Sequence, residues 1–455
     1  MQDILCHVHS LLPLRDAARA ACVSHVFLNS WRCRPNLYFN TEALGLEANC
    51  GRTSRDFTKI VDHILKKYSD IGLKTFQLAM YGCYYIESCH LDSWLHLALT
   101  LGIEELILAT NSMVPKYNFP LSLLSGKSGN SIRYLRLSFC IFRPTVRLGC
   151  FKSLKKLHLY CVGISGDELG YLLPVSVALE QLELAYCNEI ICLKIPHVLQ
   201  RLSCLDVAAC HNLQMIKSEA PNLSSLCFEW FHHHVHTSLG EALHVKKLQM
   251  LCFRDFYYVQ LPTIMPNLEA LTIDSICQIA SIPSVHSKFC SLKYLNICVP
   301  GEVRGPVYDY LSLASFLGAS PCLETFILRI HVPEVRVKYG LFSGDPSHPR
   351  QMPEHRYVKL KRAKIIGFYP AKSLLELASH VLETATSLEC LTLDTTYCSC
   401  GRRHSDPAKC YLVAIKRYFE GKVPSTARLD VEGPCSGVRP NDRRWQGFTV
   451  FDGRS

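Results

Sequence analysis

Apolar and polar positions follow a unit, L-x-x-L-x-L, that recurs along most of the chain. Twelve segments match it when Ile, Val, Phe and Met count as equivalents of Leu, and their first residues are Leu73, Ile103, Ile132, Leu154, Leu179, Leu202, Leu223, Val245, Leu268, Leu292, Leu323 and Leu388. Between Ile132 and Leu292 successive first residues stand 21 to 25 residues apart. A period of this length indicates a repeat architecture rather than a single compact core.

Each unit predicts a short strand with one buried face, because its last three positions alternate apolar, polar and apolar. A single strand of this kind cannot bury its apolar face alone, so the units must stack in parallel and share one core. Residues 71–335 are therefore predicted to form a leucine-rich-repeat solenoid. This is an α/β repeat fold, in which a curved parallel sheet carries helices and turns on its convex side.

Cysteines recur at one place in the unit, three residues after its last apolar position. Cys140, Cys187 and Cys210 stand there, Asn111 takes the same place in an earlier unit, and Cys161 comes one residue early. Side chains at this position bond the backbone of the neighbouring turn in such repeats. Many of the 24 cysteines are thus predicted to be structural, and reduced, since the chain is long and shows no export signal.

The regions that flank the array depart from the repeat. Phe57, Ile60, Val61, Ile64 and Leu65 have helical spacing, so residues 41–70 are predicted to be a linker and a helix that caps the N-terminal end of the solenoid. A Pro- and Gly-punctuated loop is predicted at 336–354. Residues 355–435 mix strand and helix patterns and are predicted to extend and close the solenoid, and residues 436–455 are predicted to be a flexible tail.

Residues 1–40 read as a small all-helical segment. Asp3 can cap a first helix that Pro13 stops, an alanine-rich helix follows at 17–23, and Ser24 can cap a third helix that reaches Trp31. Three short helices bury little apolar surface, so this segment needs a partner or the solenoid to complete its core.

The run DILCHVHSLLPLRDAARAACVSHVFLNSW resembles an F-box, in particular the F-box of plant F-box/leucine-rich-repeat proteins. Residues 355–435 resemble the FBD-type C-terminal region of the same group. The resemblance implies that the segment docks a Skp-family adaptor, and through it a cullin, while the repeats hold a protein substrate for an SCF-type ubiquitin ligase. On the same resemblance, the residues that contact the adaptor are Ile4, Leu5, Val8, Leu12, Pro13, Asp16, Val23 and Ser24.

The family motif begins with Leu-Pro just before the acidic residue that Asp3 matches, whereas this chain begins Met1-Gln2. Either the true start lies upstream or adaptor docking is weakened. The alternative to a ligase subunit is therefore a leucine-rich-repeat scaffold that binds a partner protein without recruiting a ligase.

Composition and motifs narrow the function. No phosphate loop, H-E-x-x-H or G-x-S-x-G motif is present, so we expect a non-catalytic recognition subunit without a cofactor. No apolar run is long enough for a membrane span, and we expect a cytoplasmic or nuclear protein. The net charge of +10 is weighted towards the C-terminal region but lacks interleaved aromatic residues, so no nucleic acid is expected as a partner.

Two clusters suggest metal ligands. His232, His233, His234 and His236 crowd one loop without an acidic residue or Cys at zinc spacing, so solvated histidines are expected there. Cys398, Cys400, His404 and Cys410 offer four soft ligands, but a C-x-C start suits a closed zinc site less well than C-x-x-C. We expect no metal, and zinc at the second cluster stays an open alternative.

The residues that choose a substrate are predicted to be the polar positions between the repeat leucines, on the concave face of the strands. The candidates are Arg133, Tyr134, Arg136, Lys155, Lys156, His158, Gln181 and Glu183.

Overall fold

The computed structural model describes residues 2–32, 34–46, 52–68, 72–83, 86–111, 116–124, 127–145, 151–230, 235–238, 244–252, 261–275, 288–300, 309–331, 356–395, 407–433 and 448–450. The chain forms two compact units. Unit 1 comprises Met1–Leu223 and His233–Glu241, and unit 2 comprises Ser224–His232 and Ala242–Ser455.

Unit 1 begins with three short helices, α1 (Gln2–Leu11), α2 (Leu14–Ala21) and α3 (His25–Arg32). A parallel sheet follows, whose strands in spatial order are β1 (Asn36–Phe39), β2 (Thr75–Ala79), β3 (Glu105–Ala109), β5 (Tyr134–Ser138), β7 (Lys156–Tyr160), β8 (Gln181–Ala185) and β10 (Cys204–Ala208). Unit 1 also has two small parallel sheets. One pairs β4 (Tyr117–Asn118) with β6 (Cys140–Ile141). In the other, β11 (Met215–Ser218) lies between β9 (Cys192–Ile195) and β13 (His236–Ser238).

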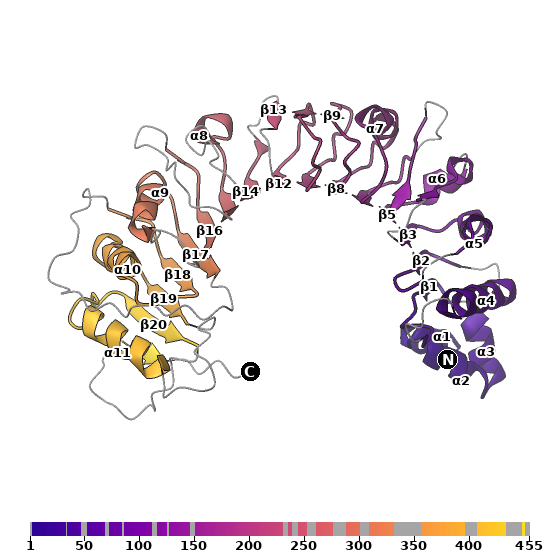
Figure 1. The fold of residues 1–455 in the computed structure, drawn as a ribbon, viewed down its shortest axis with the longest axis horizontal. Coiled ribbons are helices and arrows are strands. Elements are labelled where there is room, and N and C mark those ends of the chain that lie inside the picture. The colour runs from indigo at the N-terminus through magenta and orange to yellow at the C-terminus, as the bar shows by residue number, and fades with distance from the viewer. Residues whose placement is uncertain are drawn as a thin grey trace. The chain divides into compact units, whose positions relative to one another are not determined.

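Helices and turns connect the strands of unit 1 on one side of the sheet (Figure 1). They are α4 (Arg52–Lys67), α5 (Ser88–Thr100), the 3-10 turn η1 (Leu121–Leu124), α6 (Lys127–Ser131), α7 (Gly166–Leu172) and the 3-10 turn η2 (Leu173–Val175). The other side of the sheet carries no helix among the described residues of this unit. It is called here the open face.

Unit 2 repeats this plan. Its parallel sheet has the order β12 (Ser225–Trp230), β14 (Lys247–Cys252), β15 (Ala270–Ser275), β16 (Tyr294–Pro300), β17 (Thr325–His331), β18 (Arg362–Ile366), β19 (Cys390–Asp394), β20 (Arg428–Glu432) and β21 (Phe448–Val450). Its connections include α8 (Leu261–Ile264), the 3-10 turn η5 (Tyr310–Leu313), α9 (Ala314–Gly318), α10 (Lys372–Thr384) and α11 (Pro407–Phe419).

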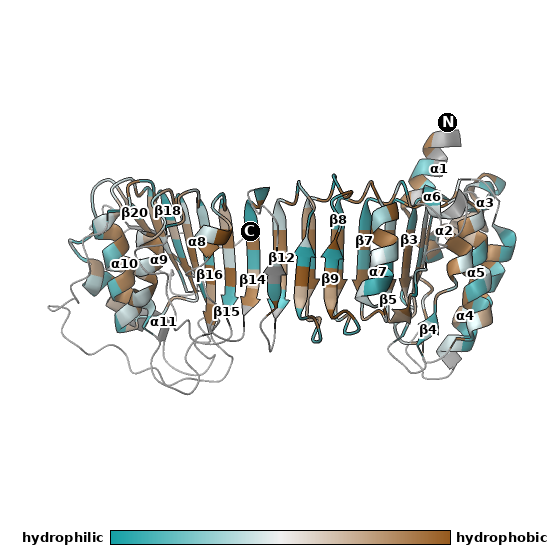
Figure 2. Ribbon diagram, turned by 90° about the horizontal axis from the view of Figure 1, so that it is seen from above, coloured by the Kyte–Doolittle hydropathy of each residue, from teal (hydrophilic) through white to brown (hydrophobic). Residues whose placement is uncertain are grey.

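The apolar positions of the repeat form the core, as the spacing predicts. In all twelve units the three apolar residues are buried, with at most 4% of any of them exposed. Equivalent leucines stand in register on neighbouring strands, as Leu135, Leu157 and Leu182 do on β5, β7 and β8. Hydrophobic and hydrophilic residues alternate along the strands (Figure 2), so the leucine-rich-repeat architecture is confirmed.

The cysteine positions also form a ladder, as predicted. The Cys187 thiol donates to the Leu159 carbonyl at 3.5 Å, and the Asn111 amide donates to the Cys83 carbonyl at 2.9 Å. In four adjacent repeats a residue with positive φ ends the strand, namely Phe139 (60°), Cys161 (53°), Tyr186 (55°) and Ala209 (50°). This left-handed residue turns the chain out of the strand at a steric cost that only the repeated packing can offset. Cys161 occupies this turning position, which explains why it comes one residue early.

Residues 36–39 correct the prediction that 1–40 is entirely helical. They form β1, which pairs in parallel with β2 and buries Leu37 and Phe39. The unit was missed because Arg34 stands where the pairing places the first leucine of the repeat, three residues before Leu37. The helix predicted to cap the N-terminal end of the solenoid is α4. It is not a terminal cap, because it connects β1 to β2 as the helix of the first repeat. The helices α1 to α3 precede the first strand instead (Figure 1).

In the C-terminal region, the strands β18, β19 and β20 alternate with the helices α10 and α11, in line with the mixture of strand and helix patterns at 355–435. β18 belongs to a weak repeat unit, Leu360-x-x-Ala363-x-Ile365, whose three residues are all buried. The predicted tail at 436–455 is wrong in one respect, because β21 lies within it and pairs with the otherwise unpaired edge of β20.

A buried cation joins the helical segment to the first repeat. The Arg34 guanidinium donates through Nη1 to the His9 carbonyl at 3.0 Å and through Nη2 to the Leu12 carbonyl at 2.8 Å. It also lies over the Trp31 ring, 5.7 Å from its centre. The Tyr68 hydroxyl, just after α4, donates to the Arg34 carbonyl at 2.6 Å. One residue therefore satisfies the carbonyls at the end of α1 and anchors them to the solenoid.

Replacing Arg34 with Met should keep the aliphatic bulk but remove the guanidinium bonds to both carbonyls, of which the His9 carbonyl keeps only the Leu12 amide. We expect the free energy of unfolding of residues 2–32 to fall by about 2 to 4 kcal/mol. Amide hydrogen exchange should then be faster in α1 and α2 and unchanged in β5, β7 and β8. Arg19→Met, at an exposed position on α2, is the matched control and should leave exchange unaltered. Unchanged protection of α1 in the Arg34 variant would contradict this role.

Candidate protein-recognition surfaces

An apolar stripe runs along one side of α1 and faces solvent. Ile4, Val8 and Leu11 are 67%, 51% and 72% exposed. Their spacing of four and three residues places them on one face of the helix. The opposite face holds the buried His9, whose Nε2 lies 3.0 Å from the Ala17 carbonyl. Apolar side chains gathered on the surface in this way make the stripe a candidate site for protein contact.

Two more apolar residues, Val23 and Val26, are exposed on the same helical segment. The residues that α2 buries in the small core of the helical segment are Leu14, Ala17 and Ala21. The exposed valines therefore belong to the surface of the segment and not to its interior.

The residues implied in adaptor contact divide into two groups. Ile4, Val8, Pro13, Asp16 and Val23 are exposed and available for contact. Leu12 and Ser24 are half-buried, and the Ser24 hydroxyl accepts a bond from the Val26 amide at 3.2 Å at the start of α3. The side chain of Leu5 lies outside the described residues. Leu11 and Val26 were missed, although Leu11 could have been found from its helical spacing to Ile4 and Val8.

Six of the eight predicted substrate-contacting residues form a lattice on the open face of unit 1. Pairing places Tyr134, Lys156 and Gln181 in one row across β5, β7 and β8. A second row of Arg136, His158 and Glu183 lies two residues further along the strands. These side chains alternate with buried leucines, so they project to the side opposite the helices.

The other two candidates, Arg133 and Lys155, lie apart from this lattice. Each precedes its strand and pairs with an acidic residue of a neighbouring repeat, Arg133 with Glu104 at 3.5 Å and Lys155 with Glu180 at 3.1 Å. Their exposed ion pairs line the edge of the sheet and contribute little to stability.

His158 is the centre of the lattice. Its ring packs edge-on against Tyr134 at 5.1 Å, and its Nδ1 lies 3.3 Å from the Tyr134 hydroxyl. Its Nε2 lies 3.0 Å from Oε1 of Glu183, without the alignment of a hydrogen bond. Burial, followed by the positive charges of Arg136 and Lys156, lowers the pKa of His158 to about 4. The imidazole is therefore neutral at physiological pH.

A row of rings, called here the aromatic row, borders the lattice at the ends of the strands. Phe139 and Tyr160 meet edge-on at 5.3 Å, Tyr160 and Tyr186 at 5.3 Å, and Tyr186 and His211 at 6.3 Å. Tyr160 and Tyr186 are 37% and 38% exposed. Tyrosine at such a place offers a large, rigid contact area, which is typical of protein interfaces. The row was missed because its members hold different places in their repeats, some in the strand and some in the left-handed turn.

Most of the candidate metal ligands of the sequence lie outside the described residues, so both clusters stay predictions. Cys398, Cys400 and His404 lie outside the described residues, as do His232, His233 and His234, and the Cys410 side chain in α11 is not described either. His236 is exposed in β13. Within the described part of the chain, no helix is both long and apolar enough to cross a membrane.

The lowered pKa of His158 predicts a pH-dependent stability. In the unfolded chain the imidazole takes up a proton near pH 6.5, whereas in the folded chain it does so only near pH 4. The unfolded state thus binds more protons between these values, and the free energy of unfolding must fall as the pH falls through this window. His158→Gln should reduce that fall, as measured by urea unfolding between pH 7 and pH 5. Exposed His197→Gln is the control, and equal pH profiles of wild type and the His158 variant would refute the assignment.

Comparison with known proteins identifies the family of this chain. The family model described as "At1g61320/AtMIF1, LRR domain" matches residues 64–436, which is more than half of the chain. This range runs from within α4 to just beyond β20 and leaves out α1 to α3.

Individual relatives come from Arabidopsis thaliana. A putative F-box/LRR-repeat protein, At5g02930, is 23% identical over 187 residues, which are 41% of this chain and 36% of that protein. A putative F-box/FBD/LRR-repeat protein, At4g26350, is 26% identical over 184 residues, which are 40% of each chain. The FBD-associated F-box protein At1g66310 is 24% identical and is covered to 39% of its length. The chain thus matches well under half the length of these relatives.

The repeat period, the parallel sheets with buried leucines and the extent of the family match lead to the same assignment. The chain is similar to plant proteins named for an F-box and leucine-rich repeats, and it belongs to the At1g61320/AtMIF1 leucine-rich-repeat domain family.

Proposed function

We propose that this chain is the substrate-recognition subunit of an SCF-type ubiquitin ligase. Its N-terminal helical segment acts as an F-box that docks a Skp-family adaptor, and through the adaptor a cullin and a RING protein. The open face of the repeats binds the protein to be ubiquitinated. The chain contributes no catalytic residue and no cofactor, because other subunits transfer ubiquitin, and it works in the cytoplasm or nucleus.

The observation that carries this proposal is the exposed apolar stripe of Ile4, Val8 and Leu11 on α1. A free-standing segment gains nothing from apolar side chains in water, so the stripe is best explained by a partner that covers it. Arg34 ties the same segment to the first repeat. A partner on α1 would therefore be held at a defined place relative to β1 and β2, as a recognition subunit requires.

The lattice and the aromatic row support the substrate side of the proposal. The lattice offers cationic, anionic and neutral polar groups within three adjacent strands, and Tyr160 and Tyr186 border it. Tyrosine and arginine are both enriched at specific protein interfaces, and this face offers both. The neutral imidazole of His158 lets the face bind without desolvating a third cation beside Arg136 and Lys156.

Adaptor docking is tested by placing acidic residues in the stripe. Ile4→Glu together with Val8→Glu should weaken binding of a recombinant Skp-family adaptor by at least about thirtyfold, because two apolar contacts become desolvated charges. Biolayer interferometry with the full chain measures this change. Ile191→Glu, at an exposed apolar position on the repeats, is the matched control and should bind as wild type does.

Equal binding by the stripe variant and wild type would show that the adaptor uses another surface. No binding of the adaptor by wild type at all would instead favour a repeat scaffold that holds its partner without recruiting a ligase.

Substrate binding is tested on the aromatic row. Tyr160→Ala with Tyr186→Ala should remove two large aromatic contacts beside the lattice, at a cost of about 2 kcal/mol or more, while adaptor binding stays intact. Quantitative affinity purification under proteasome inhibition should then show at least about tenfold less of the ubiquitinated partner. Tyr171→Ala on α7 removes a similarly exposed tyrosine from the helix side and should have no effect. Equal recovery with both variants would exclude the aromatic row from recognition.

A further inference from the structure

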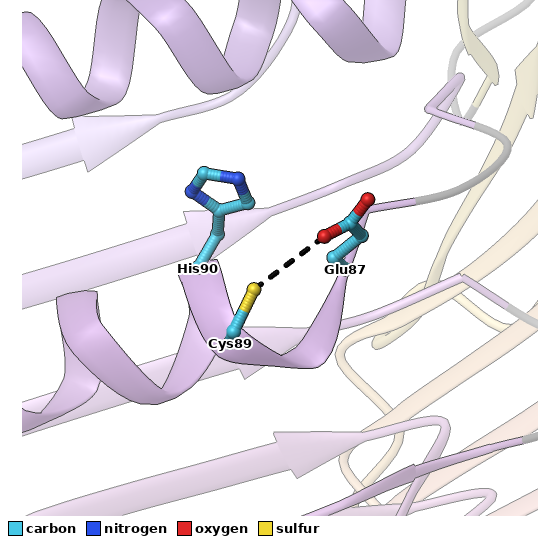
Figure 3. Close-up of side chains that lie close together, drawn as sticks. All are labelled: Glu87, Cys89 and His90. Carbon is cyan, nitrogen blue, oxygen red and sulfur yellow. Dashed lines mark hydrogen bonds between the residues drawn. The ribbon is translucent and has the colours of Figure 1, made fainter.

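Three side chains of different chemistry converge at the start of α5, away from the recognition surfaces. Glu87 precedes the helix, and Cys89 and His90 lie in its first turn. One donor atom of each lies within 4.8 Å of the other two (Figure 3). The Cys89 thiol donates to Oε2 of Glu87 at 3.6 Å. The Glu87 side chain does not cap its own helix, so its carboxylate is directed to this group and not to the helix backbone.

A second carboxylate lies on the other side of His90. Oδ2 of Asp62, on α4, lies 3.5 Å from Nδ1 of His90. Its other oxygen, Oδ1, accepts a bond from the Trp94 indole at 2.6 Å. The indole therefore fixes the carboxylate in place, and the carboxylate orients the imidazole. With Nδ1 turned towards Asp62, Nε2 is the ring nitrogen left for another partner.

This arrangement has the composition of a transition-metal site. A thiolate, an imidazole and a carboxylate suit Zn²⁺, whereas Mg²⁺ and Ca²⁺ take oxygen ligands alone. A carboxylate behind a ligating histidine is the usual outer partner that fixes the ring at zinc sites. Zn–S and Zn–N bonds of about 2.3 and 2.0 Å place tetrahedral donors roughly 3.5 Å apart. Glu87 and Cys89 are exposed, so side-chain rotation can bring the donor atoms to that separation.

We propose that Glu87, Cys89 and His90 bind a zinc ion, with Asp62 as the outer partner that orients His90 and with the fourth position open to water. Binding replaces the thiol proton of Cys89, which leaves to solvent, by a sulfur–zinc bond. The ion joins the residue before α5 to its first turn, and through Asp62 it links α5 to α4. It acts on the helix side of the first repeats and does not depend on the proposed ligase role.

The test uses Co²⁺ as a spectroscopic probe of the reduced, chelator-stripped full chain. A thiolate bound to Co²⁺ gives a charge-transfer band in the near ultraviolet, and a tetrahedral site adds visible bands that Zn²⁺ abolishes by competition. The absorption spectrum of the wild type with one equivalent of Co²⁺, minus that of the Cys89→Ser, His90→Gln double variant, should show these bands. This difference isolates the site from other thiols of the chain. His96→Gln with Cys290→Ser, both exposed and outside the cluster, is the matched control and should bind as wild type does.

Cys89→Ser alone should lose the charge-transfer band while its circular dichroism stays that of wild type, since the side chain is exposed. Asp62→Asn should retain the bands and weaken the Zn²⁺ affinity by about ten- to a hundredfold, as loss of an outer carboxylate does. A featureless difference spectrum between wild type and the double variant would overturn the zinc site. An unchanged affinity in the Asp62 variant would overturn the role given to Asp62.

Discussion

Each repeat carries an apolar face that it cannot bury alone, and the rest of the molecule depends on this constraint. A strand such as β7 sends Leu157 and Leu159 to one side, and only the equivalent leucines of β5 and β8 can cover them. Stacking at strand spacing removes all of these side chains from water at once. The same step commits the alternate residues, among them His158, to the open face, so burial of the leucines fixes which side chains can meet a partner.

The array also determines what happens at the ends of its strands. Phe139, Cys161, Tyr186 and Ala209 adopt a left-handed backbone that costs energy in an isolated chain. The thiol and amide ladder beside them bonds the backbone of the preceding repeat, and it holds this turn in one repeat after another. Tyr186 stands in such a turn, and Tyr160 is the last strand residue before one, so the aromatic row lies where the strands end.

The start of the solenoid solves a different problem. The first repeat has only one neighbour, so its exposed end would remain open to water without a cap. The position of the first leucine is taken by Arg34, whose guanidinium instead binds the carbonyls of His9 and Leu12. A polar junction replaces the apolar contact there, and it couples three helices too small to fold alone to a core that is already stable. This coupling leaves the opposite face of α1 free, with its apolar side chains in solvent.

The sequence by itself determined the repeat, the core and the open-face residues, because a period-two strand pattern repeated at fixed intervals has one efficient way to bury its leucines. It also placed Tyr134, Arg136 and His158 on the open face and the ladder cysteines in the turns. The sequence did not reveal β1, because Arg34 stands where the repeat has its first leucine. It also did not show that Arg133 and Lys155 lie outside the lattice. Only the tertiary structure decided that Arg34 binds the end of α1, how burial neutralises His158, and that Asp62 of α4 lies beside His90 of α5. These properties depend on contacts between residues far apart in the chain, and no local pattern of residues encodes them.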